Sequence, residues 1–95
     1  MELLTEVKKG SILIGNVSGM KYLILKDSDP HYDGKSLELR FVREDHTHWR
    51  KQAFKVWDRY DGNSTGLFFH EGPTKESIAW ADECLATLKY SPDYA

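Results

Sequence analysis

Residues 47–60 read THWRKQAFKVWDRY, and this stretch decides how the rest of the chain is interpreted. When the residues are spaced about 100° apart, as in an α-helix, aromatic and small side chains fall on one side and charged ones on the other. The apolar side carries Trp49, Ala53, Val56, Trp57 and Tyr60. The pattern therefore predicts an amphipathic helix with a buried aromatic stripe and a basic outer face.

Short apolar runs before this stretch have the composition of β-strands. Residues 11–17 and 21–26 are rich in β-branched and apolar side chains, and the Ser18-Gly19 turn between them favours a hairpin. Residues 35–44 alternate apolar and polar side chains, as expected for a strand with one buried face. The part of the chain before residue 47 is therefore predicted to form three antiparallel strands.

The remaining chain contains one more predicted strand and one more predicted helix. Residues 65–71 form a short apolar run, and Thr74 is well placed to cap a helix that ends before Pro92. The core face of this helix is predicted to carry Ile78, Ala81, Cys84, Leu85 and Leu88.

We therefore predict the α+β class: a small antiparallel sheet of three to four strands with two helices packed on one face. In the alternative, residues 49–58 form a strand, and the fold is an SH3-like small β-barrel with a C-terminal helix. The helical interpretation is preferred because the spacing fits a helical period better than it fits alternation. The chain is predicted to be a single domain, residues 1–95, with residues 91–95 as a flexible tail.

Composition and charge indicate the cellular compartment of the protein and the kinds of partner it can bind. The net charge of −2 does not favour general nucleic-acid binding, which usually requires a clearly basic protein. Cys84 is the only cysteine, so an internal disulfide is excluded and a reducing, cytoplasmic setting is expected. The first residues lack the pattern of a signal peptide, and no apolar run approaches the ~20 residues that span a bilayer. We expect a cytoplasmic protein without a membrane partner.

The sequence contains no recognisable catalytic or cofactor motif. His46 and His48 have a spacing that could place two imidazoles beside a metal ion, but the spacing identifies no third ligand. Cys84 falls on the predicted core face of the last helix, as a structural thiol does. We therefore predict a protein that is not an enzyme and that has no metal site and no cofactor.

Basic and aromatic side chains are concentrated between residues 40 and 59. Phe54 lies about 110° from the centre of the predicted apolar stripe, which suggests an exposed contact residue. Arginine and aromatic side chains commonly anchor protein interfaces. The predicted contact residues are Tyr32, Arg50, Lys51, Phe54, Lys55 and Arg59. A second predicted set, which could receive the phosphate of a ligand, is Arg40, Arg43, His46 and His48.

These residues predict a small binding protein that inhibits or adapts a larger protein partner. Proteins of this size and aromatic content without catalytic motifs include many accessory proteins encoded by viruses of bacteria. In the alternative, the protein sequesters a small nucleotide-like anion, in a pocket that a homodimer could build between its subunits. Binding to nucleic acid is the least favoured of the three interpretations.

Overall fold

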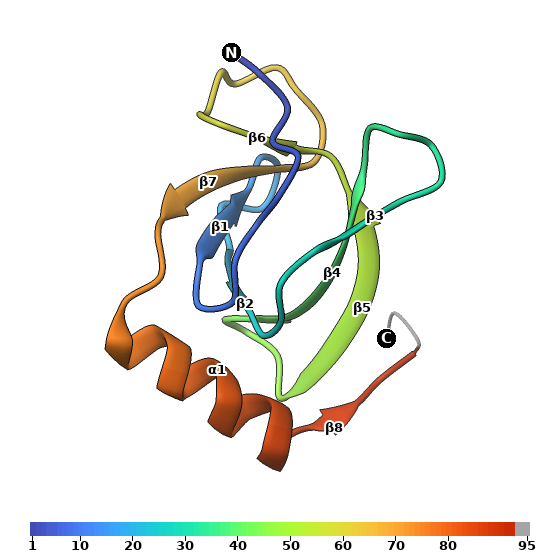
Figure 1. Ribbon diagram of the computed structural model, residues 1–95. Coiled ribbons are helices and arrows are strands. Elements are labelled where there is room, and N and C mark those ends of the chain that lie inside the picture. Colours follow the sequence, from blue (N-terminus) through green and yellow to red (C-terminus); the bar gives the residue numbers. More distant parts are fainter. Residues whose placement is uncertain (93–95) are drawn as a thin grey trace.

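In the computed structural model, which describes residues 1–92, the chain forms a strongly curled sheet with one α-helix outside it (Figure 1). The strands are β1 (Ile12–Gly15), β2 (Lys21–Ile24), β3 (Asp29–Pro30), β4 (Leu37–Arg43), β5 (His48–Phe54), β6 (Val56–Trp57), β7 (Leu67–Glu71) and β8 (Lys89–Tyr90). The helix is α1 (Lys75–Thr87). Most neighbouring strands are antiparallel, whereas the pairs β5–β8 and β6–β7 are parallel.

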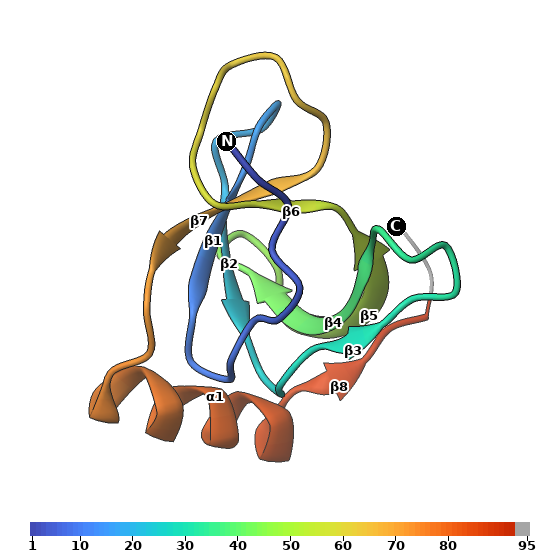
Figure 2. The same cartoon turned by 45° about the horizontal axis from the view of Figure 1, so that its top comes forward.

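The sheet curls back on itself because β5 and β6 follow directly on each other in the chain but lie near opposite ends of the strand order. In hydrogen-bonding order the strands run β6-β7-β1-β2-β4-β5-β8, with β3 beside β4. β5 pairs with β4, and β6, which follows after Lys55, pairs with β7 at the other end of this order. Figure 2 shows the resulting ring of strands. The N-terminal chain covers β6, since the Leu4 N–H donates to the Val56 carbonyl at 2.7 Å.

The concave side of the curled sheet holds the main hydrophobic core. Its buried members are Val7, Leu13, Tyr22, Ile24, Leu37, Leu39, Phe41, Val56 and Leu67. Three aromatic rings meet in this core: the centroid of Phe41 lies 5.2 Å from that of Tyr22 and 5.4 Å from that of Phe54. β4 contributes Leu37, Leu39 and Phe41 to this core, because every second side chain of a strand points to the same face.

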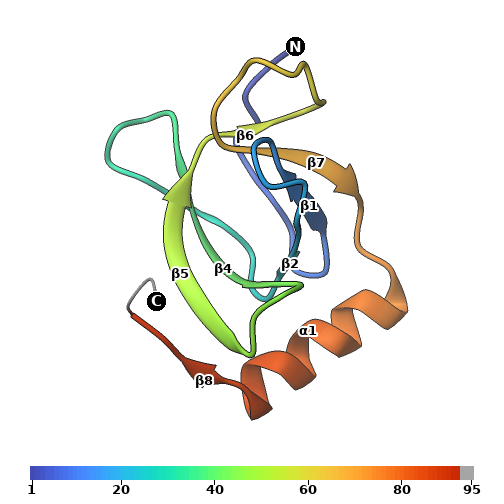
Figure 3. The same ribbon diagram turned by 180° about the vertical axis from the view of Figure 1, so that it is seen from behind.

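A second, smaller core lies on the convex side, beneath α1. Leu23 and Leu25 from the sheet meet Ala81 from the helix there, and Trp49 packs against their edge. Of the helical residues, Ser77 and Ala81 are buried, so α1 rests on the sheet through a narrow stripe. Figures 1 and 3 show α1 along one end of the sheet, opposite the loop between β6 and β7.

The predicted fold class is wrong. Residues 47–60 form no helix; β5 and β6 occupy most of this stretch, and the sheet is mixed, curled and larger than the predicted one. The other interpretation of residues 49–58, as a strand, agrees with β5 and β6. The helical spacing arose because Trp49 on the convex side is covered by α1, while Arg50 and Gln52 face the concave side opposite Phe41 and Leu39. Apolar and polar residues therefore do not alternate along this strand as they do when one face is buried.

The predicted flexible tail, residues 91–95, can be compared with the structure only at residues 91 and 92. Ser91, the first residue of the predicted tail 91–95, donates its N–H to the Trp49 carbonyl at 3.0 Å, and residues 93–95 lie outside the described residues. Within residues 1–92, no helix combines the length and apolar character that crossing a membrane requires.

Candidate functional site

A groove of about 420 Å³ separates α1 from the convex face of the sheet. We call it the α1 groove. Its lining residues are Ile12, Lys21, Leu23, Val42, Arg43, Glu44, His46, Trp80, Cys84 and Leu88. The floor is apolar because β1, β2 and β4 turn Ile12, Leu23 and Val42 towards the helix. On the other side, α1 supplies Trp80 and Cys84 one turn apart, and its C-cap residue Leu88 follows them. Such a volume accommodates a few apolar side chains of a partner.

Trp80 is the most exposed apolar side chain of the groove. Its exposed fraction is 57%, although tryptophan is usually mostly buried. Neighbouring Cys84 is half-buried, and this burial, together with the negative charge of Glu83, raises the pKa of its thiol. Cys84 therefore behaves as a small apolar group of the groove wall rather than as a nucleophile.

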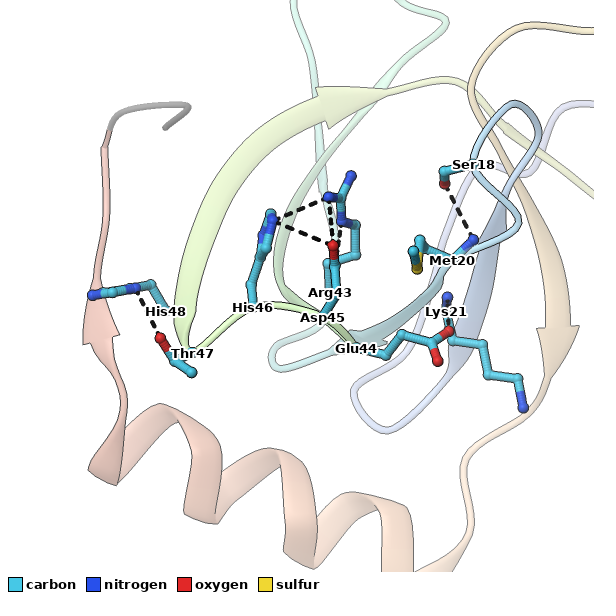
Figure 4. A network of polar contacts seen from close by, with 9 residues as sticks. All are labelled: Ser18, Met20, Lys21, Arg43, Glu44, Asp45, His46, Thr47 and His48. Carbon is cyan, nitrogen blue, oxygen red and sulfur yellow. Dashed lines mark hydrogen bonds and ion pairs between the residues drawn. The ribbon is translucent and has the colours of Figure 1, made fainter.

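The turn between β4 and β5 forms the polar end of the groove. The Arg43 guanidinium donates to both carboxylate oxygens of Asp45, from Nε at 2.6 Å and from Nη2 at 2.8 Å. Its Nη2 also lies 3.0 Å from Nε2 of His46, and Figure 4 shows these three side chains clustered together. Hydrogen bonds to Asp45 and Tyr22 raise the pKa of Arg43. Burial and the nearby Arg43 charge lower the pKa of His46, which favours the neutral form of this imidazole.

The predicted phosphate-binding residues are thus only partly brought together. Arg43 and His46 are neighbours, but Asp45 already occupies the guanidinium of Arg43. His48 is exposed at the start of β5, where its Nδ1 lies 3.3 Å from the hydroxyl of Thr47. Arg40 lies elsewhere, with its guanidinium carbon 5.9 Å from the ring centroid of Trp49.

The predicted protein-contact residues do not form one surface. Two premises of that prediction are wrong: Phe54 packs against the concave core, and Arg50 is buried, with an exposed fraction of 8%. Lys51 is exposed on β5 and lies 3.8 Å from the Glu38 carboxylate. Lys55 is half-buried between β5 and β6, where its carbonyl accepts from the Leu67 N–H.

Tyr32 and Arg59 are the remaining predicted contact residues, and both are exposed. Tyr32, 94% exposed, lies in the loop between β3 and β4, with its ring centroid 4.1 Å from that of His31. Arg59 lies in the loop between β6 and β7, and its Nε is 3.8 Å from the Asp58 carboxylate. Neither residue lines the α1 groove.

Trp80 was missed by the sequence interpretation, although a usable signal was present. It lies about 100° around the helix from Ala81, at the centre of the predicted core face, on a helix whose position was predicted well. The same criterion singled out Phe54, but it was applied there to a segment that is not helical. An off-stripe aromatic residue indicates an exposed contact only where the helix itself exists.

Comparisons with protein-family models, with curated proteins and with solved structures found no match to this chain. Residues 1–92 contain no group of three or more His, Cys, Asp or Glu side chains arranged to hold a metal ion.

Proposed function

We propose that this chain is a cytoplasmic, non-enzymatic binding protein that inhibits or adapts a larger protein partner. In this proposal the partner inserts apolar side chains into the α1 groove and packs against Trp80. The observation that carries it is the exposure of Trp80, 57%, at the edge of an apolar groove of about 420 Å³. Tryptophan is among the residues that contribute most to binding energy at protein interfaces.

The shape of the groove supports the same conclusion. A groove between a helix and a sheet offers apolar walls that water solvates poorly, and covering them with a partner is favourable by roughly 25 cal/mol for each Å² of apolar surface. α1 is attached through the narrow stripe of Ser77 and Ala81, and none of its residues belongs to the concave core.

A photo-crosslinking amino acid at position 80, introduced in the cells that naturally produce the protein, would identify the partner. The matched control is position 60, because Tyr60 has the same exposed fraction as Trp80, 57%, and lies in the loop at the opposite end of the molecule (Figure 1). We expect a specific crosslinked protein from position 80 and none of that mass from position 60.

The affinity of the purified partner then tests the role of the groove. We expect Trp80→Ala to weaken binding about 30-fold, which corresponds to about 2 kcal/mol, and Tyr60→Ala to change it less than about fivefold. Equal affinity of the Trp80→Ala variant and the parent protein would contradict the proposal.

A second candidate function is the capture of a small nucleotide-like anion on the concave side. A hollow of about 350 Å³ is shared there by Arg43, Tyr22 and Phe54, which combines a cation with two aromatic rings. It ranks second because an anion must displace Asp45 from Arg43. Thermal unfolding with nucleotides tests it: a ligand at about 100 times its Kd adds about 2.7 kcal/mol of stability, and Arg43→Gln should abolish this effect. Unchanged unfolding with every nucleotide would remove this candidate.

A further inference from the structure

Two exposed acidic residues of α1 lie beside Trp80, at the rim of the α1 groove and outside its lining. Glu76 and Glu83 lie four residues before and three residues after Trp80, so their side chains flank its ring on the exposed side of α1. Asp82 lies on another side of the helix, where it pairs with Lys9 at 2.9 Å. The helix carries no basic residue in its last turn. A partner that covers Trp80 must therefore approach two exposed carboxylates.

The cations at the sheet wall do not balance these acids. Arg43 lies opposite Tyr22 and is held in a bidentate contact with Asp45, and burial together with the Arg43 charge disfavours a charge on His46. Lys21 remains, and next to it the Glu44 carboxylate accepts from the Lys21 backbone N–H at 2.5 Å. The charges that line the groove therefore roughly balance, and Glu76 and Glu83 beside Trp80 make its rim negative.

We infer that the occupant of the α1 groove is an amphipathic helical segment of the partner, with large apolar side chains on one face and Lys or Arg beside them. This inference rests on the proposed function, and the charge around the groove determines its chemistry. Apolar side chains spaced three and four residues apart suit a hydrophobic groove between secondary-structure elements. Cations at the edges of that face would lie beside Glu76 and Glu83, where attraction also speeds the encounter.

The same charges argue against a second copy of this chain as the occupant. A two-fold symmetric dimer places the same patch on both subunits. Trp80 could then pack across the interface, but Glu76 and Glu83 of both subunits would be brought together. Like charges at an interface disfavour that pairing.

Two synthetic peptides test the inference. Both are 18-residue amphipathic helices with Leu on one face; the polar positions are Lys in the first peptide and Glu in the second. Fluorescence anisotropy of the labelled peptides gives their Kd for the parent protein, for Trp80→Ala, and for the double variant Glu76→Lys with Glu83→Lys. Both acids are exposed, so the double variant should fold as the parent does.

We expect the Lys peptide to bind the parent at least tenfold more tightly than the Glu peptide and to bind more weakly as salt is raised. The double variant should reverse this preference, and Trp80→Ala should weaken the Lys peptide about tenfold or more. Equal binding of both peptides that is lost in Trp80→Ala would overturn the charge inference and leave the groove in place. Binding of the Lys peptide that Trp80→Ala does not change would contradict the groove, and with it the proposed function.

Discussion

The concave and convex sides of the curled sheet are built differently. The concave side is filled by side chains from six strands and the N-terminal segment, and three of its rings pack within about 6 Å of one another. The convex side is covered by a single helix that buries Ser77 and Ala81 and leaves Trp80 exposed. Close packing gives the concave side its stability, whereas the loosely covered convex side leaves apolar surface exposed, where we propose that a partner binds. In this proposal, stability and binding belong to opposite faces of one sheet.

The largest expected effect concerns the point where the ring of strands closes. Gly66 has a φ of +109°, and a Cβ at this position would collide with the Lys55 carbonyl oxygen. Gly66→Ala should lower the free energy of unfolding by about 3 kcal/mol or more, since strained backbone and a backbone clash add. Urea unfolding measures the change.

Gly34→Ala is the matched control for this closure. Gly34 also has a positive φ, +71°, but open space surrounds its Cβ position. Gly34→Ala should lower the free energy of unfolding by only about 1 kcal/mol, because only the backbone strain of a positive φ is added and no clash. Equal losses for both variants would show that closure at Gly66 does not hold the concave side together.

A smaller effect is expected for the anchoring of α1. The Thr74 hydroxyl accepts from the Ser77 N–H at 3.0 Å, and the Ser77 hydroxyl accepts from the Thr74 N–H at 2.8 Å. Thr74→Ala should cost about 1 kcal/mol, whereas Thr87→Ala, at the exposed end of α1, should change stability by less than about 0.5 kcal/mol.

Hydrogen exchange locates this loss. With Thr74→Ala, amides of α1 should exchange faster while those of β4 keep the protection of the parent, because the helix opens without the concave core. Faster exchange of β4 to the same degree as α1 would mean that the two sides unfold as one unit.

The smallest effect concerns pH. Burial and Arg43 lower the pKa of His46 in the folded state below its ordinary value of 6.5. Its contribution to stability is therefore fully present above about pH 6.5 and decreases as the pH falls from there through the folded pKa. NMR titration of the His46 ring should give a pKa below 6.5, and His46→Gln should reduce the pH dependence of unfolding in this range. A folded pKa at or above 6.5 would contradict the described environment.

The elements with one buried face were predicted well from the sequence. The alternation in residues 35–44 correctly indicated β4, and the capping residue Thr74 correctly marked the start of α1. The prediction for residues 47–60 failed because polar and apolar side chains mix on both faces of β5. Arg50 is buried on the concave side with Phe54, and Lys51 is exposed on the convex side with Trp49. Periodicity recognises a strand with one apolar and one polar face, which β5 does not have.

The candidate site was less predictable than the fold. Lys21, Val42 and Trp80 are far apart in the sequence, and the position of α1 over the sheet brings them to one groove. The prediction for Phe54 reversed its role, because an off-stripe residue of the supposed helix is an inward-facing residue of β5. Apart from the position of Trp80 on α1, the groove left no local pattern in the chain, because its residues come from distant elements.

The division between a stabilising concave side and a binding convex side is tested most directly by the free energies of unfolding of Phe54→Ala and Trp80→Ala. Phe54 packs against Tyr22 and Phe41, with ring centroids 6.0 and 5.4 Å away, whereas the ring of Trp80 is more than half exposed. We expect Phe54→Ala to cost about 2–4 kcal/mol and Trp80→Ala less than about 1 kcal/mol. A loss for Trp80→Ala that equals or exceeds the loss for Phe54→Ala would show that the tryptophan belongs to the folding core, and would contradict the account.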